Sequence, residues 1–149
     1  MRIDKFTNGK YKQNCYLLYN NKHEAIIVDP GGAADEIRDH IEKKKLKLLA
    51  IINTHAHHDH VGGISDFKDW YSCPFFLSSE DLQLLNHVNL YLKAFKDNWL
   101  CRVPKVDYFL DQIELPIELG DIKVDILFTP GHTPGGVCFV IDNNIFTGD

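Results

Sequence analysis

The amino-acid sequence predicts an α/β fold, because short apolar runs of strand length alternate with an amphipathic helical segment. Residues 24–28 and 48–53 form two such runs, and residues 33–45 between them place Ile37 and Ile41 on one helical face. A histidine-rich segment follows the second run directly. Because α/β proteins usually carry their sites at the carboxyl ends of strands, we expect a functional site there.

The N-terminal residues predict an antiparallel meander. Strands are expected over 1–7, 14–19 and 24–28, since Asn8-Gly9 and Asn20-Asn21 between them are turn formers. The chain then reaches the helix over 33–45 and the strand over 48–53. This order delivers the histidine-rich segment from the end of a buried strand.

The histidine-rich segment, residues 54–60, packs four possible metal ligands into six residues. His55 and His57 are two apart, so on an extended chain their imidazoles project to the same side and reach one ion. Asp59 and His60 follow where the chain turns, and a carboxylate and an imidazole suit a second ion. The segment therefore predicts a metal centre.

A solvated polar loop is the alternative interpretation of these histidines. The order H-x-H-x-D-H and the strand-like run before it argue against that alternative, and so does Gly62-Gly63-Ile64 after it, which opens a short helix. His58 is expected to be a packed or hydrogen-bonded side chain, because strand alternation turns it away from His57. Asp29 is expected to accept backbone hydrogen bonds at the Pro-Gly-Gly turn that follows it.

Two further segments present single candidate ligands. The strand predicted over 122–128 leads into a loop in which two prolines and three glycines surround His132, as in rigid binding loops. A short strand from Asn144 ends near Asp149. Each of these residues alone is a weak signal.

A long helix is predicted to begin near Ser78, with Asp81 completing a sequence that resembles a capping box. Its apolar residues recur at intervals of three and four, which favours core packing: Leu82, Leu85, Val88, Leu92 and Phe95. Trp70 and Trp99 are expected to be packing residues as well.

Composition limits the function classes. The 149 residues are 44% hydrophobic with a net charge of −5, which supports one domain and does not suggest a nucleic-acid binder. No segment approaches the roughly 20 apolar residues of a membrane span, and none has the apolar stretch of a signal peptide. The four cysteines form no C-x-x-C pair, so we expect reduced thiols in a cytoplasmic protein without a membrane partner.

Four motifs together resemble the metallo-β-lactamase superfamily, and most closely its glyoxalase II-like (hydroxyacylglutathione hydrolase-like) branch. The motifs are DPGG at 29–32, THAHHDH at 54–60, GHTPGG at 131–136 and TGD at 147–149. The resemblance implies an αββα sandwich with a site that holds two Zn²⁺ ions, or Fe or Mn in their place. It assigns the ligands as follows: His55, His57 and His132 to the first ion, Asp59 and His60 to the second, and Asp149 to both.

The chain departs from this family at its end. Relatives continue past the TGD motif and supply one more histidine to the second ion, whereas this sequence stops at Asp149. We therefore expect residues 1–149 to be a single but incomplete domain that lacks the C-terminal portion of the sandwich.

The resemblance implies hydrolysis of an acyl-thioester, possibly linked to glutathione, by a metal-bound hydroxide that Asp59 orients. One alternative is an oxidoreductase similar to the persulfide dioxygenases, with mononuclear iron on His55, His132 and Asp149. Another is a truncated, catalytically impaired fragment whose unpaired sheet edge needs a partner. β-Lactam hydrolysis is less favoured.

Overall fold

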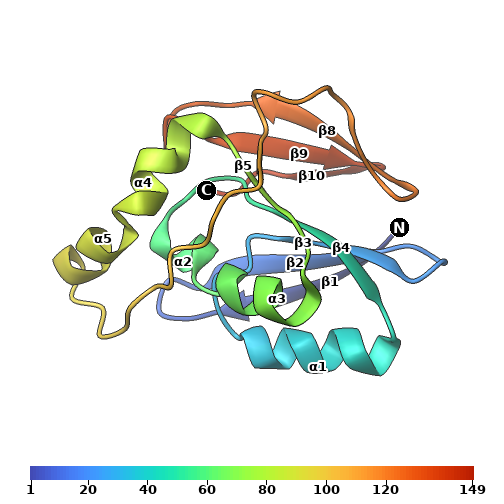
Figure 1. The fold of residues 1–149 in the computed structure, drawn as a ribbon, viewed down its shortest axis with the longest axis horizontal. Coiled ribbons are helices and arrows are strands. Elements are labelled where there is room, and N and C mark those ends of the chain that lie inside the picture. Colours follow the sequence, from blue (N-terminus) through green and yellow to red (C-terminus); the bar gives the residue numbers. More distant parts are fainter.

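Two β-sheets face each other in the computed structural model, which describes residues 1–149 (Figure 1). The first sheet has the order β1 (Arg2–Asn8), β2 (Gln13–Tyr19), β3 (Glu24–Val28), β4 (Lys47–Ile52), β5 (Phe75–Leu77) and β6 (Tyr108–Phe109). The second has the order β10 (Asn144–Phe146), β9 (Val137–Ile141), β8 (Ile122–Phe128) and β7 (Ile117–Leu119). Strands β1 to β3 pair antiparallel, β3 to β6 pair parallel, and the second sheet is antiparallel throughout.

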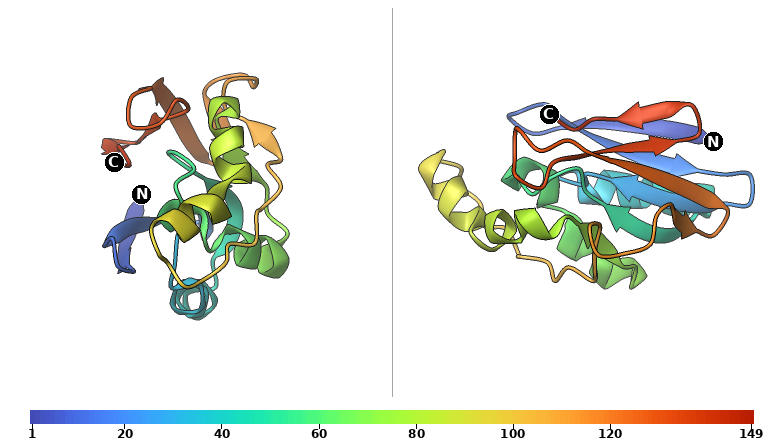
Figure 2. Two further views of the ribbon diagram at one scale, coloured as in Figure 1. Left: turned by 90° about the vertical axis from the view of Figure 1, so that its left-hand side faces the viewer. Right: turned by 90° about the horizontal axis from the view of Figure 1, so that it is seen from above.

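The helices lie against the first sheet and at one end of the sandwich (Figure 1). Helices α1 (Ala34–Lys44) and α3 (Ile64–Tyr71) cover the face of the first sheet that points away from the second sheet. The short helix α2 (His58–Val61), the 3₁₀ turn η1 (Ser79–Asp81) and helices α4 (Leu82–Asn86) and α5 (Val88–Ala94) gather at one end. Figure 2 shows the second sheet lying over the first, with no helix on its outer face.

Two hydrophobic clusters hold these layers together. Leu17 and Ile27 belong to the cluster between the first sheet and the helices, and their strand neighbours Leu18 and Ile26 belong to the cluster between the sheets. Alternate residues of one strand therefore enter different cores, because successive side chains point to opposite faces of a sheet. The central strands β3 and β4 are apolar after their first residues, Glu24 and Lys47, for this reason.

The predicted α/β fold class is confirmed: two facing β-sheets form a sandwich with helices packed against the first sheet. The expected meander, first helix and strand 48–53 all occur, with bounds shifted by no more than one residue. No helix of the structure is long and apolar enough to cross a membrane.

The long helix predicted after Ser78 is wrong in two respects. It is divided into η1, α4 and α5, and the break falls at His87, whose backbone ends α4 and precedes α5. Ser78 makes no side-chain capping hydrogen bond, and the carboxylate of Asp81 is fully buried and contacts other loops. Leu85, Val88 and Leu92 of the apolar stripe pack into the core as predicted. Its two ends do not, since Leu82 is only half-buried and Phe95 is 54% exposed.

All four cysteines are free and buried, as the sequence predicts. Burial raises the pKa of the Cys73 and Cys101 thiols to about 11, so both are neutral at pH 7. They act as small apolar core residues. Trp70 packs partly buried against the core as expected, whereas Trp99 is 40% exposed.

Candidate metal centre

Three loops meet at one end of the sandwich and carry the candidate ligands. The first ligand loop, residues 53–57, follows β4, and the second ligand loop, residues 129–136, joins β8 to β9. Residues 147–149 follow β10. The backbone N–H of Val137 donates to the carbonyl of Thr54 at 2.9 Å, which joins the first loop to the second sheet. The motifs that lie far apart in the sequence are therefore brought together.

His55, His57 and His132 form one candidate ligand group. One ligand atom from each lies within 4.8 Å of the others, and their ring centroids are 4.6 to 4.9 Å apart. Burial and the neighbouring imidazoles lower the pKa of His55 to about 2, and burial and His132 lower the pKa of His57. Both rings are neutral at pH 7, which is the form that binds a metal ion.

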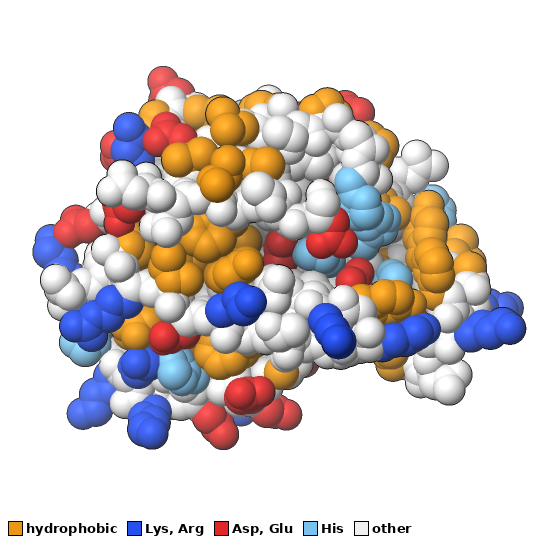
Figure 3. All heavy atoms as spheres, turned by 180° about the vertical axis from the view of Figure 1, so that it is seen from behind, with side chains coloured by type: hydrophobic (Ala, Val, Ile, Leu, Met, Phe, Trp, Pro, Cys, Tyr) orange, Lys and Arg blue, Asp and Glu red, His pale blue; other side chains and the backbone are white.

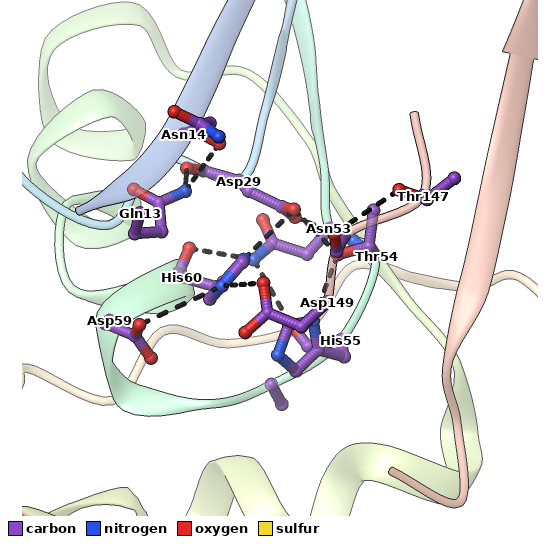
Figure 4. A network of polar contacts seen from close by, with 12 residues as sticks. Gln13, Asn14, Asp29, Asn53, Thr54, His55, Asp59, His60, Thr147 and Asp149 are labelled. Carbon is purple, nitrogen blue, oxygen red and sulfur yellow. Dashed lines mark hydrogen bonds and ion pairs between the residues drawn. The ribbon is translucent and has the colours of Figure 1, made fainter. Parts of the chain in front are cut away.

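Asp59, His60 and Asp149 form a second group beside the first (Figure 4). The Nε2 atom of His60 lies 3.9 Å from an Asp59 carboxylate oxygen and 3.4 Å from Oδ1 of Asp149. The other oxygen of Asp149, Oδ2, lies 3.8 Å from Nε2 of His132 in the first group. Asp149 thus stands between the two groups with one oxygen toward each, as a bridging carboxylate requires.

Four buried imidazole nitrogens have no hydrogen-bond partner, and two of them belong to this cluster. These two are Nε2 of His55 and Nε2 of His60, whose ring centroids are 4.1 Å apart, and the other two are the nitrogens of His58. The opposite nitrogens are occupied, since Nδ1 of His55 lies 3.0 Å from the Thr54 hydroxyl and Nδ1 of His60 lies 3.1 Å from Asp29. Such contacts fix the tautomer and direct the Nε2 lone pair to a metal. Because a buried unpaired polar atom is costly, the donor set fits a cation.

Asp29 supports the histidines, but its contacts differ from the prediction. Its carboxylate accepts hydrogen bonds from the backbone N–H and the hydroxyl of Thr54, at 2.7 and 2.6 Å, and not from the Pro-Gly-Gly turn. It also contacts Nδ1 of His60 (Figure 4). Burial opposes protonation of His60, but the hydrogen bond to Asp29 and the charges of Asp29, Asp59 and Asp149 together outweigh burial and raise the pKa of His60. Although Asp29 is close enough to be a ligand, its oxygens already have these partners.

Glycines allow two turns to pack backbone against backbone around α2. A Cβ on Gly31 would lie 1.5 Å from the carbonyl oxygen of Asp59, and one on Gly62 would lie 2.4 Å from the carbonyl of Gly31. A Cβ on Gly63 would lie 2.7 Å from the carbonyl of Pro30. The turn at 29–32 therefore sets the position of the helix that carries Asp59 and His60. The sequence shows both glycine pairs but not this contact.

His58 lies outside the candidate ligand groups, as predicted, but for another reason. It begins α2, so helical rotation and not strand alternation separates it from His57. Its ring stacks on Phe95 with centroids 5.6 Å apart, meets Tyr11 edge-on, and approaches Asp97 at 3.4 Å. The expected packing role is confirmed.

A cavity of about 380 Å³ opens beside the first group. His57 and His132 form one wall, and helices α4 and α5 form the other with Gln83, His87 and Tyr91. A larger cavity of about 470 Å³ lies on the other side of α2, but it shares only Asp59 with the candidate ligands. Figure 3 shows histidine and acidic side chains gathered in a hollow of the surface. His132 and Asp149 have side chains about half exposed, at 45% and 52%, so a small molecule can reach the cluster.

Known proteins are similar to this chain in sequence and in fold. The model of the metallo-β-lactamase superfamily matches residues 8–149. The chain is 31% identical to the hydroxyacylglutathione hydrolase GloC of Haemophilus influenzae, over all of this chain and 71% of that protein. Curated relatives that it matches are longer, since the chain spans 60% of one from Aquifex aeolicus and 72% of one from Mycobacterium tuberculosis.

Solved structures agree with the sequence comparisons. The crystal structure of BLEG-1 B3 metallo-β-lactamase superimposes with a TM-score of 0.89 at 28% identity, covering 98% of this chain and 71% of that one. TTHA1623 in a di-iron-bound form superimposes with a TM-score of 0.77, also at 28% identity, covering 97% and 70%. The shared motifs, the two facing sheets and the match over residues 8–149 lead to one conclusion. The chain belongs to the metallo-β-lactamase superfamily.

Proposed function

We propose that this chain is a metal-dependent hydrolase that cleaves acyl-thioesters. The observation that carries the proposal is the pair of buried, partnerless Nε2 atoms of His55 and His60, each oriented by a bond to its opposite nitrogen. These atoms meet the side chains of four other residues at the end of the sandwich: His57, Asp59, His132 and Asp149. Membership of a superfamily made up largely of metal-dependent hydrolases agrees with this chemistry.

The six side chains would hold two ions. His55, His57 and His132 would bind the first, Asp59 and His60 the second, and Asp149 both. When bound, Zn²⁺ would polarise a carbonyl oxygen as a Lewis acid and lower the pKa of a coordinated water to about 7. Imidazole and carboxylate ligands suit Zn²⁺ and also accept Fe or Mn. The likeness to a di-iron-bound protein keeps iron as the second choice.

The residues of the chain would position the substrate and the attacking water. The acyl group would enter the cavity beside His57 and His132, with polar groups of Gln83, His87 and Tyr91 facing it. Asp59 would be the catalytic carboxylate, because its side chain is 20% exposed and lies next to His60. One of its oxygens would accept a hydrogen bond from the attacking water and orient it.

The choice of a thioester rests on the sequence resemblance to the glyoxalase II-like branch and on the 31% identity to a hydroxyacylglutathione hydrolase. A glutathione-linked thioester is therefore the first substrate to test. The likeness to a B3 metallo-β-lactamase makes a β-lactam the competing substrate.

The test is a thiol-release assay on the Zn²⁺-equilibrated chain. A glutathione thioester, a coenzyme A thioester and a chromogenic β-lactam are compared, with the same chain after treatment with a chelator as control. We expect thiol release from at least one thioester, its loss with the chelator, and its return when Zn²⁺ is added back. β-Lactam cleavage without thioester cleavage would contradict the proposal, and so would oxygen consumption with a persulfide by an iron-loaded chain.

A further inference from the structure

We infer that Asp81 is a positioning residue that couples the two ligand loops, so that His55, His57 and His132 are arranged before an ion binds. This inference rests on the proposed metal-dependent function. Asp81 itself is not a ligand, because it is fully buried and its carboxylate oxygens already accept hydrogen bonds from the loops.

Three hydrogen bonds connect Asp81 to both loops. Its Oδ2 atom accepts from the backbone N–H of Ala56 and from the hydroxyl of Thr133, each at 2.9 Å. Its Oδ1 atom accepts from the backbone N–H of Gly135 at 2.7 Å. Ala56 lies between His55 and His57, and Thr133 follows His132. One carboxylate thus fixes the backbone beside every member of the first ligand group.

The second ligand loop packs against Asp81 at Gly135, where a side chain would clash with Asp81. A Cβ on Gly135 would lie 2.8 Å from the carboxyl carbon of Asp81 and 2.8 Å from its backbone nitrogen. Only glycine fits there without movement of one partner. The close contact with Asp81 therefore explains why position 135 of the GHTPGG motif is a glycine.

A helix-capping role does not explain these contacts. An N-terminal cap accepts hydrogen bonds from the first N–H groups of its own helix, whereas neither η1 nor α4 has a side-chain capping bond. The donors to Asp81 lie 25, 52 and 54 residues away in the sequence. Its side chain therefore serves the two ligand loops.

Coupling by Asp81 bears directly on metal affinity. One ligand atom from each of the three imidazoles lies within 4.8 Å of the others, and the buried Nε2 of His55 has no hydrogen-bond partner. The imidazoles therefore do not stabilise this arrangement of the loops until an ion binds. A carboxylate that holds both loops reduces the conformational freedom lost on binding. Mutation of residues that orient metal ligands typically lowers metal affinity about 10- to 100-fold.

Asp81→Asn is the informative variant, because it keeps the side-chain volume. In either orientation of the asparagine amide, its NH₂ group would face a backbone N–H, that of Ala56 or that of Gly135, which now donates a hydrogen bond to Asp81. The contact to one loop is then lost while the core stays filled. The matched control is Asp111→Asn, which removes a carboxylate that accepts two bonds from Ser79 and contacts neither ligand loop.

The experiment titrates each metal-free 149-residue variant with Co²⁺ and records the visible spectrum and the dissociation constant of the first ion. We expect the wild type and Asp111→Asn to agree, and Asp81→Asn to bind the first Co²⁺ about 10- to 100-fold more weakly with an altered spectrum. Circular dichroism of the metal-free proteins checks that the fold is kept. If Asp81→Asn does not fold, Thr133→Val removes one of the three bonds, and about a threefold or larger loss of affinity is expected.

Two outcomes would overturn the inference. One is a Co²⁺ affinity and spectrum of Asp81→Asn, or of Thr133→Val where that variant replaces it, equal to those of the wild type. The other is an equal loss of affinity in Asp111→Asn. A wild-type chain that binds no Co²⁺ would instead overturn the proposed function, so the two failures are distinguishable.

Discussion

At the scale of single residues, the histidines of one motif have different roles because their neighbours differ. His55 contacts Thr54 through Nδ1 and lies in a group of three imidazoles, whereas the ring of His58 packs against Phe95 and Tyr11. The nitrogens of His58 also lack hydrogen-bond partners, but no histidine of that group lies within reach of them. Two histidines three positions apart therefore have different roles, one as a candidate ligand and the other as a packing residue.

The pair His55→Ala and His58→Ala tests this distinction. We expect His55→Ala to weaken binding of the first ion by at least about 100-fold, since it removes a ligand and not only its support. His58→Ala should keep the metal stoichiometry and lose about 1 to 2 kcal/mol of unfolding free energy through lost packing. Equilibrium dialysis followed by elemental analysis measures the first effect, and urea unfolding measures the second. Equal metal loss in both variants would contradict the assignment.

A second residue-scale contact links β1 to α1 and gives a pH-dependent prediction. Asp4 lies 2.7 Å from Nε2 of His40. Partial burial opposes ionisation of Asp4, but hydrogen bonds from His40 and Tyr19 and the charges of His40 and Lys44 outweigh it and lower its pKa. A carboxyl with a lowered folded-state pKa stabilises the fold above its unfolded pKa and loses that effect as the pH falls through the folded value.

Asp4→Asn should therefore be less stable than the wild type at pH 7, by under about 1 kcal/mol because the pair is partly exposed. The difference should shrink as the pH falls below the ordinary Asp pKa of 3.8 and vanish once the pH is below the lowered pKa of folded Asp4. Thermal unfolding of both chains across this pH range measures it. A difference that grows on acidification would show that the pair does not stabilise the fold.

At the scale of elements, the position of α2 depends on close backbone packing. The turn at 29–32 and the glycines at 62 and 63 leave no room for a Cβ. Gly31→Ala should lower the unfolding free energy by about 3 kcal/mol or more, because a Cβ 1.5 Å from the Asp59 carbonyl forces the helix to move. Gly131→Ala is the control, since a Cβ at Gly131 meets nothing within 4 Å. Urea unfolding measures the unfolding free energy of both variants. A similar decrease in both would contradict the packing argument.

The same scale shows which features the sequence could reveal. Strands such as β3 and β4 and helix α1 follow from local apolar periodicity, and the candidate ligands of the site follow from short motifs. The break between α4 and α5 at His87 could not be predicted from the sequence, because the helical spacing of apolar residues continues through it. The role of Asp81 was misread for a related reason: its donors lie in distant loops, and local spacing carries no information about them.

At the scale of the whole molecule, the second sheet has an exposed edge and outer face. β10 is an edge strand that pairs only with β9. Its Ile145 is 55% exposed, and Leu127 on β8 is 50% exposed. Exposed apolar edge strands favour pairing with other chains. The alternative of a fragment that needs a partner predicts association through this edge.

Ile145→Lys should therefore reduce association of the chain. Sedimentation velocity across a concentration series is expected to show growing species for the wild type and fewer for Ile145→Lys, since a charge on an edge opposes strand pairing. Circular dichroism should be the same for both. A wild type that stays monomeric at every concentration would remove this expectation.

The metal content of the chain tests the proposed function most directly. The wild-type chain of 149 residues is equilibrated with Zn²⁺ and dialysed, and its metal content and protein concentration are then measured. We expect one tightly bound ion per chain on His55, His57 and His132 and a second, weaker one on Asp59 and His60 at higher Zn²⁺. A folded chain that retains no Zn²⁺, iron or manganese above the level of the dialysis buffer would contradict a metal-dependent hydrolase.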